Sequence, residues 1–250
     1  MTRASESNHW YTKDGQPMYT VIGANGKERN TDLRDAKKHG YIPSVTTILN
    51  ILAKPGLNLW LQKQAIMAAL TLPRQDGEDE ENWLDRVLID SKAQGRDAAD
   101  RGTSMHSEIQ SHLEHKAKEY PRYVFASKEC LDAHFGQQDW ICEESFGHEL
   151  GFGGKVDLHC PGIIVDIKTK EKVGDKVDVY DEHLLQLAAY RTGLGYPTAR
   201  CANLFVDLEG NTKMIEHDET KLANAAERFY YADISCHFVP LCLLITTDID

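Results

Sequence analysis

Two aspartates and a lysine in residues 151–170 have the types and the spacing to do chemistry together. This segment reads GFGGKVDLHCPGIIVDIKTK, and its Pro161-Gly162 pair is typical of a two-residue turn between strands. With this turn, Asp157 faces Asp166 across a hairpin, and the alternation of side chains places Lys168 on the same face. Opposed Cβ atoms lie about 4.5 to 5.5 Å apart, so both carboxylates can bind one divalent cation, and they repel each other without it.

The opposite face of this predicted hairpin is apolar and is expected to face a core. Its residues are Val156, Leu158, Ile163, Val165 and Ile167. The alternative is a surface hairpin whose aspartates are simply solvated. Strands disfavour Asp, and two Asp residues opposite each other cost stability, so the pattern favours a metal site.

The length and composition of the chain predict one globular domain. With 250 residues, of which 41% are hydrophobic, the chain can bury a large core. We expect a single domain over residues 1–250, with an N-terminal hairpin and connection at 1–43, a helical part at 44–137, and a sheet with helices at 138–250.

The net charge of −11 argues against non-specific binding of nucleic acid by a basic surface, because phosphate contacts come from Lys and Arg. A local contact is compatible with this charge, and Lys170 is the candidate for a substrate contact. It belongs to a cluster on and after the hairpin that comprises Lys155, Lys168, Lys170, Lys172 and Lys176.

The six cysteines contain no Cys-x-x-Cys pair, and the N-terminal residues MTRASESNHWY contain no apolar signal segment. No apolar run approaches the length of a membrane span. We therefore expect reduced, buried thiols in a cytoplasmic protein. The spacing of Cys201, Cys236 and Cys242 does not fit an iron-sulfur cluster.

The first part of the chain reads as a hairpin followed by helices. Residues 9–22 are typical of a hairpin around Asp14-Gly15, and residues 23–42, rich in Gly, Asn, Asp and Lys, indicate an irregular connection. Ser44 is the predicted N-cap of a helix that reads SVTTILNIL, and a second helix follows Pro55-Gly56.

A long helical pattern from residue 82 to about 116 carries His106. We expect breaks in this helix near Gly95 and Gly102. His106 lies beside the apolar stripe and could reach toward the aspartates, while the alternative is an ordinary packed or surface histidine. A separate zinc site on the same helix is a further alternative, and its ligands would be Glu108, His112 and His115.

Residues 138–150 read as a strand that leads into the hairpin, after a short helix at 126–137. This strand offers Glu143, Glu144 and Glu149 as further carboxylates. Glu144 is the preferred candidate, because it shares a face with apolar neighbours and would be partly buried.

Residues 181–195 read as an amphipathic helix in which Gln186 and Tyr190, four positions apart, share a face. The alternative for this pair is a plain contact on the helix surface. Strands are expected at 200–207 and 212–216, and a last helix at about 219–231.

Five short motifs follow one another between residues 44 and 190. They are SVTTIL from Ser44, GTSMH ending at His106, GGKVD ending at Asp157, DIKT beginning at Asp166, and QLAAY from Gln186 to Tyr190. In this order and spacing the chain resembles the RecB-type branch of the PD-(D/E)XK nuclease superfamily. Phage exonucleases, CRISPR adaptation nucleases and the mitochondrial genome-maintenance exonuclease are similar in this layout.

The resemblance implies a restriction-endonuclease-like fold, which is an α/β core with a central mixed sheet flanked by helices. It implies that Lys168 is the catalytic lysine, and that Gln186 and Tyr190 position this lysine and the DNA backbone. The metal ligands that it implies are His106, Asp157, Asp166, the main-chain carbonyl of Ile167 and, at a less constant position, Glu144.

The activity that the resemblance implies is that of a metal-dependent DNA exonuclease, with Mg²⁺ or Mn²⁺ as cofactor and DNA ends as substrate. It also implies phage or bacterial DNA recombination and repair as the setting, with a homo-oligomer or a recombination protein as partners. One alternative is a catalytically inactive nucleic-acid-binding or assembly protein on the same fold, which the intact Asp-x-Lys pattern argues against. The zinc protein built on the histidine-rich helix is the other alternative.

Overall fold

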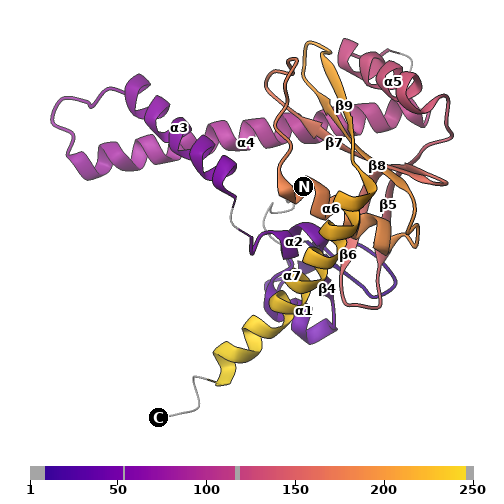
Figure 1. Ribbon diagram of the computed structural model, residues 1–250. Helices are drawn as coiled ribbons and strands as arrows, with labels where there is room; N and C mark the ends of the chain where they lie inside the picture. Colours follow the sequence, from indigo (N-terminus) through magenta and orange to yellow (C-terminus); the bar gives the residue numbers. More distant parts are fainter. Residues whose placement is uncertain (1–8, 53, 116–118, 246–250) are drawn as a thin grey trace. The chain divides into compact units, whose positions relative to one another are not determined.

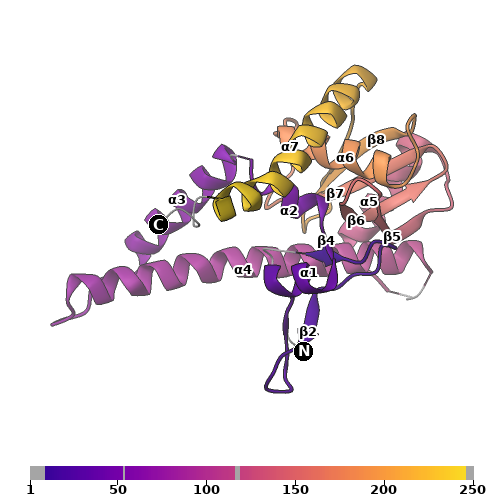
Figure 2. The ribbon, with the colours of Figure 1, turned by 90° about the horizontal axis from the view of Figure 1, so that it is seen from below.

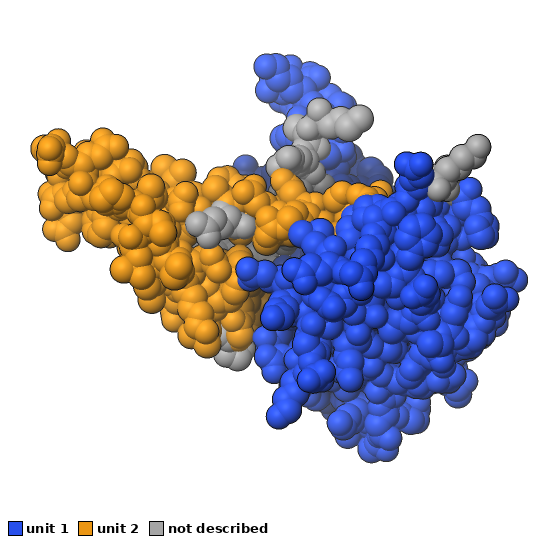
Figure 3. Space-filling model, turned by 90° about the horizontal axis from the view of Figure 1, so that it is seen from above, with its two compact units in different colours: residues 1–52, 109–250 blue, residues 53–108 orange. Residues whose placement is uncertain are grey.

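The computed structural model describes residues 9–52, 54–115 and 119–245, which form a mixed α/β structure (Figure 1). The chain forms two compact units (Figure 3). Unit 1 contains Met1–Leu52 and Ile109–Asp250, and unit 2 contains Ala53–Glu108. The helical part that the sequence predicts at 44–137 is therefore divided between the two units.

The main sheet of unit 1 has five strands among the described residues, in the order β5-β6-β7-β8-β9. They are β5 (Ile141–Gly147), β6 (Gly153–Cys160), β7 (Ile163–Thr169), β8 (Arg200–Val206) and β9 (Thr212–Glu216). β7 and β8 are parallel and are joined through helix α6 (Asp181–Gly193), whereas the other neighbouring strands are antiparallel. The prediction of a mixed sheet with helices is confirmed.

The β6–β7 hairpin has the register that its turn predicts. Leu158 pairs with Val165 and Cys160 with Ile163, and Gly162 has the positive φ of 83° that favours glycine in the turn. In the described residues the ladder ends at Leu158–Val165, one pair before the predicted pair of aspartates. At this point the Asp157 side chain replaces the main-chain acceptor, since the amide of Ile167 donates to Asp157 Oδ2 at 2.7 Å.

Both faces of β7 are buried, whereas the sequence predicted a core on one face and a site on the other, with a solvated polar face as the alternative. Ile164 and Val165, on opposite faces, are both fully buried. Val156 packs in the same apolar cluster as Ile164, so the expected alternation of β6 is broken near Asp157. The physical reason is that β7 is a central strand with a parallel neighbour, and such strands are covered on both sides.

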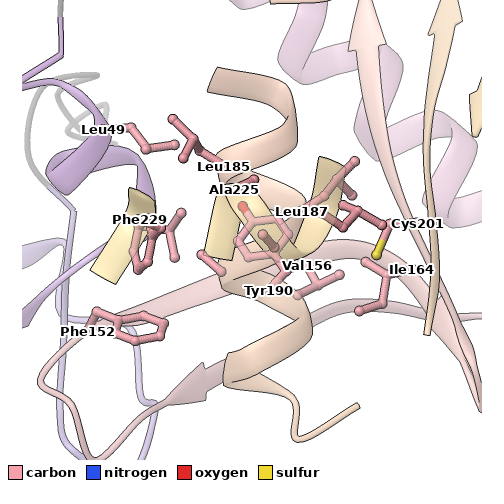
Figure 4. Close-up of a cluster of buried hydrophobic side chains, with 14 of the residues drawn as sticks. Leu49, Phe152, Val156, Ile164, Leu185, Leu187, Tyr190, Cys201, Ala225 and Phe229 are labelled. Carbon is pink, nitrogen blue, oxygen red and sulfur yellow. The ribbon is translucent and has the colours of Figure 1, made fainter. Parts of the chain in front are cut away.

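The core of unit 1 forms where α6 packs with α2 (Val45–Leu49), α7 (Glu219–Ile245) and the sheet (Figure 1, Figure 2). Figure 4 shows Val156, Ile164, Leu187 and Tyr190 in this cluster. The predicted N-cap of α2 is confirmed, because Ser44 Oγ accepts from the amide of Thr47 at 3.0 Å. α7 is longer than the helix predicted at 219–231.

The N-terminal region keeps its predicted turn and differs in its strand pairs. Near Asp14-Gly15 the amide of Met18 donates to the carbonyl of Trp10, which closes the turn. The strands before and after this turn do not pair with each other. Instead, β1 (Trp10–Tyr11) pairs with β4 (Ile42–Pro43), and β2 (Thr20–Ile22) pairs with β3 (Glu28–Asn30).

Residues 23–42 are not the irregular connection that their composition indicates. Besides β3 they contain helix α1 (Leu33–His39), which the composition of the segment hides. Asp32 and Asp35 form a reciprocal capping box at its start, and Gly40 adopts a left-handed conformation after its end. These short-range polar contacts stabilise a short helix within a polar sequence.

Unit 2 consists of α3 (Pro55–Thr71) and most of α4 (Glu80–Leu113). The breaks predicted near Gly95 and Gly102 are wrong, since α4 is continuous through both residues. Gly95 lies next to Trp60 of α3, whose ring would be at an ordinary contact distance of 3.8 Å from an added Cβ. A glycine inside a helix costs stability without ending the helix.

The remaining helix, α5 (Arg122–Phe135), begins earlier than predicted. None of the helices in the described residues combines the length and the hydropathy that a membrane span requires. Cys160 and Cys201 are free, buried thiols, as predicted, whereas Cys130 and Cys142 are partly exposed. The side chains of Cys236 and Cys242 lie outside the described residues.

Candidate functional site

Lys168 is the second-last residue of β7. It connects the carboxylate of Asp166 to helix α6. Its Nζ lies 3.1 Å from Asp166 Oδ1 and 2.9 Å from Oδ2, and it donates to Gln186 Oε1 at 2.8 Å. Burial alone would lower the pKa of Lys168, but the charges of Asp166 and Asp157 raise this pKa above its ordinary value. The ammonium group is therefore held charged beside a carboxylate that is 1% exposed.

Gln186 and Tyr190 form a buried contact, not the surface pair of the alternative reading. Gln186 Nε2 donates to the Tyr190 hydroxyl at 2.7 Å, and both side chains are buried. Burial and the charges of Asp166 and Asp157 raise the pKa of Tyr190 well above its ordinary value, so the phenol keeps its proton. With 4% of its surface exposed, Tyr190 can orient Gln186 better than it can contact a large substrate.

Asp157 and Glu143, on neighbouring strands of unit 1, form a pair of carboxylates that could hold a metal ion. One carboxylate oxygen of Glu143 lies within 4.8 Å of one of Asp157. The predicted ligand His106 is on the part of α4 that belongs to unit 2. Carboxylate and imidazole ligands of this kind bind divalent cations.

The main chain of Ile167 faces the same place as Asp157. In a strand the amide and the carbonyl of one residue point toward the same neighbouring strand. Because the amide of Ile167 donates to Asp157 Oδ2, its carbonyl is also directed toward β6. This orientation is compatible with the implied role of the carbonyl as a metal ligand.

Glu143 occupies the position that the sequence assigns to Glu144. Glu143 has a positive φ of 55°, which is uncommon for a residue with a side chain and reverses the expected alternation along β5. It also forms an ion pair with Lys155. Burial opposes charge on Lys155, but Glu143 raises its pKa above the ordinary value.

Glu144 points to a different partner. Its carboxylate contacts Nε2 of the buried His159, and 45% of the Glu144 side chain is exposed. This contact anchors Glu144 in the strand next to the left-handed Glu143. The group of metal-ligand atoms contains Glu143 and does not contain Glu144.

Lys170 is the first residue after β7 and lies two positions after Lys168 in the sequence. Its Nζ is 5.2 Å from the centre of the Tyr180 ring and 5.6 Å from the centre of the Phe205 ring. Burial lowers the pKa of Lys170, and Lys168 contributes to the lowering. The two rings hold the cation near Lys168 through cation–π contacts.

Asn203 is a member of this site that the sequence analysis misses. It is buried on β8 beside Asp166, and its Nδ2 donates to Asp166 Oδ2 at 2.7 Å. The signal that could have found it is an amide in the middle of the apolar strand RCANLFV, since buried polar groups need partners.

The separate zinc site on the histidine-rich helix is not formed among the described residues. Glu108, His112 and His115 do not appear as a group of close ligand atoms. The ring of His112 packs at 4.7 Å against Tyr120 and at 5.2 Å against Phe125. An aromatic environment of this kind is typical of a packed histidine.

No protein-family model matches this chain, and no curated protein does. Among solved structures, it matches one described as "Crystal structure of SSO0001" with 15% sequence identity and a TM-score of 0.31. That match covers 69% of this chain and 84% of the other. A likeness of this size says nothing about the fold family or the function, so the function has to be inferred from the residues of the site.

Proposed function

We propose that this chain is a metal-dependent deoxyribonuclease with a restriction-endonuclease-like core. The observation that carries the proposal is the position of Lys168, whose ammonium group is shared between Asp166 and Gln186. Asp157, on the neighbouring strand, contacts the same strand at Ile167. These are the carboxylates and the lysine of the motif pattern, and they meet at one end of a hairpin.

The donor set fits a divalent cation. Glu143 and Asp157 supply carboxylate oxygens within 4.8 Å of each other, and the motif order assigns the imidazole nitrogen of His106 to the same ion. Such ligands suit Mg²⁺, and the histidine favours Mn²⁺ in the test tube. When bound, the ion would neutralise charge on the phosphate and lower the pKa of a water molecule.

Each of the other residues has a role in this proposal. Lys168 would orient the attacking water and stabilise the negative charge that develops on the phosphate. Asp166 lies outside the group of close ligand atoms, and in this proposal it would bind the ion from β7. Gln186 and Tyr190 would hold Lys168, and Lys170 would contact the DNA backbone.

The substrate and the setting follow from the motif order. We propose DNA ends as the substrate, hydrolysis as an exonuclease, and a role in phage or bacterial recombination and repair in the cytoplasm. A homo-oligomer or a recombination protein would be the partner. The motifs and the ion pair of Lys168 with the buried Asp166 support this proposal over a protein that only binds nucleic acid, because nothing in a binding role requires a buried carboxylate.

Degradation of end-labelled linear DNA and closed circular DNA, with Mg²⁺, Mn²⁺ or EDTA, tests the proposal. We expect cleavage of the linear substrate alone, dependent on the metal, and a loss of about 100- to 1,000-fold in Lys168→Ala. Lys213→Ala is the matched control, since Lys213 is an exposed lysine of β9. Cleavage that is equal in wild type and Lys168→Ala would contradict the proposed chemistry.

A folded protein that binds DNA and cleaves neither substrate would instead be the inactive nucleic-acid-binding protein. Cleavage of the circular substrate would identify an endonuclease. The two substrates therefore separate the three activities in one experiment.

A further inference from the structure

Asn203 links the carboxylate of Asp166 to His217, the residue that follows the edge strand β9. Asn203 is fully buried and is the direct neighbour of Asp166 across the parallel β7–β8 pair. Its Nδ2 donates to Asp166 Oδ2 at 2.7 Å, and its Oδ1 lies 2.7 Å from Nε2 of His217. His217 follows β9 directly, and its amide donates to the carbonyl of Cys201 on β8.

The chemistry of these groups fixes the direction of both hydrogen bonds. An ionised carboxylate only accepts, so Asn203 presents Nδ2 to Asp166. Oδ1 therefore faces His217 and can only accept, so His217 carries a proton on Nε2. Rotation of the amide would place Oδ1 against the Asp166 carboxylate and would lose the hydrogen bond to Asp166. The donors run in one direction, from His217 through Asn203 to Asp166.

The link does not depend on the charge of His217. A neutral imidazole with its proton on Nε2 and a doubly protonated imidazole both donate from this atom. Three groups face the imidazole: Asn203 across the hydrogen bond, Lys221, which lowers its pKa after burial, and His183, whose pKa it lowers in turn. With any of these neighbours, the hydrogen bond to Asn203 still requires a proton on Nε2 of His217.

Asp166 cannot replace a lost donor with water. Its side chain is 2% exposed, its Oδ2 accepts from Asn203, and its Oδ1 accepts from Lys168. Without the amide, the carboxylate can rotate toward the ammonium group, and Lys168 then shifts away from Gln186. A single neutral side chain therefore sets the orientation of the carboxylate and the place of the lysine.

We propose that Asn203, held by His217, is a positioning residue of the nuclease site. It fixes the rotamer in which Asp166 can bind the metal ion while Lys168 stays shared between Asp166 and Gln186. This inference rests on the proposed function. His217 lines a shallow surface hollow together with Arg200 and Asp218, so the positioning chain runs from the protein surface to the site.

Three substitutions in the full chain test the inference. Asn203→Leu removes the amide at similar size, His217→Phe removes the imidazole donor, and His217→Gln keeps an N–H near the position of Nε2. The measurements are Mn²⁺ affinity by titration calorimetry and cleavage of linear DNA. Outer-shell partners of metal ligands typically contribute about 10- to 100-fold in metal affinity or activity.

We expect Asn203→Leu and His217→Phe to weaken Mn²⁺ binding by about 10- to 100-fold, and His217→Gln to bind as the wild type does. His134→Phe is the matched control. His134 also contacts a carboxylate of β9, since its Nε2 lies 2.8 Å from Glu216 Oε2, but it lies outside the positioning chain. Its Mn²⁺ affinity should equal that of the wild type.

Equal Mn²⁺ affinity in the wild type, Asn203→Leu and His217→Phe would overturn the inference and leave the proposed function standing. A loss in His217→Gln as large as in His217→Phe would also overturn it, because packing and not the donor would then matter. A wild type that neither binds Mn²⁺ nor cleaves DNA would overturn both proposals.

The wild-type protein provides a test that no folding defect can obscure. Nitrogen-15 NMR of the histidine side chains distinguishes the two neutral tautomers of His217. We expect the proton on Nε2, which the contact with Asn203 Oδ1 requires. A proton on Nδ1 alone would overturn the inference.

Discussion

Two carboxylates of unit 1 have basic partners at similar distances in different surroundings. Asp166 lies in the middle of the sheet, 2.9 Å from Lys168, and its side chain is 2% exposed. Glu216 lies on the edge strand β9, 2.7 Å from Arg200, and its side chain is 30% exposed. Short ion pairs therefore occur both in the core and at the surface of this sheet.

The difference in burial decides what each pair contributes. A surface pair exchanges its contact for water when one partner is removed, so it typically contributes less than about 1 kcal/mol. A buried charge that loses its partner typically costs about 3 to 5 kcal/mol. Buried pairs of this kind are common at functional sites, where the charge is needed for chemistry. The pair of Asp166 with Lys168 is therefore the candidate for a functional role. The pair of Glu216 with Arg200 makes only a small contribution to stability.

The largest expected effect comes from removing the buried carboxylate. Asp166→Ala removes the carboxylate that accepts from Asn203 and balances the charge of Lys168, which then keeps only its hydrogen bond to Gln186. We expect a loss of about 3 kcal/mol in the free energy of unfolding. Glu216→Ala should cost less than about 1 kcal/mol. Urea denaturation in EDTA measures both. An equal or greater stability of Asp166→Ala would mean that repulsion from Asp157 outweighs the lost contacts.

Metal binding should stabilise the site around Asp157 and leave the surface pair of Glu216 unaffected. At a free Mn²⁺ concentration 100 times the Kd, we expect a gain of about 2.7 kcal/mol in the free energy of unfolding. EDTA should reverse the gain, and Asp157→Asn should abolish it, because Asp157 is in the ligand group. Glu216→Gln is the control and should keep the full gain, as measured by thermal unfolding. A gain that persists in Asp157→Asn would locate the metal elsewhere.

The buried region should also make the protein sensitive to mild acid. Burial, with the charges of Lys168 and Lys170, lowers the pKa of His183 from 6.5 to about 3. The unfolded chain therefore binds a proton below pH 6.5 that the folded chain rejects, and stability is present above pH 6.5 and falls as the pH drops toward 3.

At pH 5 this amounts to about 2 kcal/mol relative to pH 7.5, because each pKa unit corresponds to about 1.4 kcal/mol. His183→Gln should flatten the slope of stability against pH between 5 and 7, as measured by urea denaturation. An identical slope in wild type and His183→Gln would refute the assignment.

The smallest effect belongs to the surface pair. The hydrogen bonds of Arg200 lower the pKa of Glu216 from 4.5 to about 2. Its contribution is present above pH 4.5 and is lost as the pH falls toward 2. Since Arg200 is half-exposed, solvent screening should keep this contribution below about 1 kcal/mol. The difference in stability between wild type and Glu216→Gln at pH 6 should shrink further in 1 M salt, whose Debye length is about 3 Å.

The parts of the site that lie close together in the sequence could be predicted from it. Pro161-Gly162 sets the register of the hairpin, and the four-residue spacing of Gln186 and Tyr190 sets their contact. These features depend on local geometry, namely the reach of a turn and the pitch of a helix. Residue types alone were enough to single out Asp166 and Lys168.

The parts that the sequence did not reveal depend on distant contacts or on unusual backbone. Asn203 meets Asp166 only through the parallel pairing of β7 with β8, which no local pattern encodes. Glu143 replaces Glu144 because of a left-handed residue inside a strand, and sequence alternation assumes that none occurs. Gly95 predicted a helix break, but α4 continues through it, because a single glycine weakens a helix without ending it.

The parallel pairing of β7 with β8 also has a consequence for how the protein folds. Parallel strands need a long connection, and contacts between residues far apart in the chain form slowly because loop closure costs entropy. Asp166 receives its amide partner only after α6 has crossed over and β8 has docked, and His217 arrives one strand later. A growing chain that has emerged only as far as β7 therefore exposes the aspartates and the lysine without their support, and the order of synthesis delays the assembled site until the sheet is nearly complete.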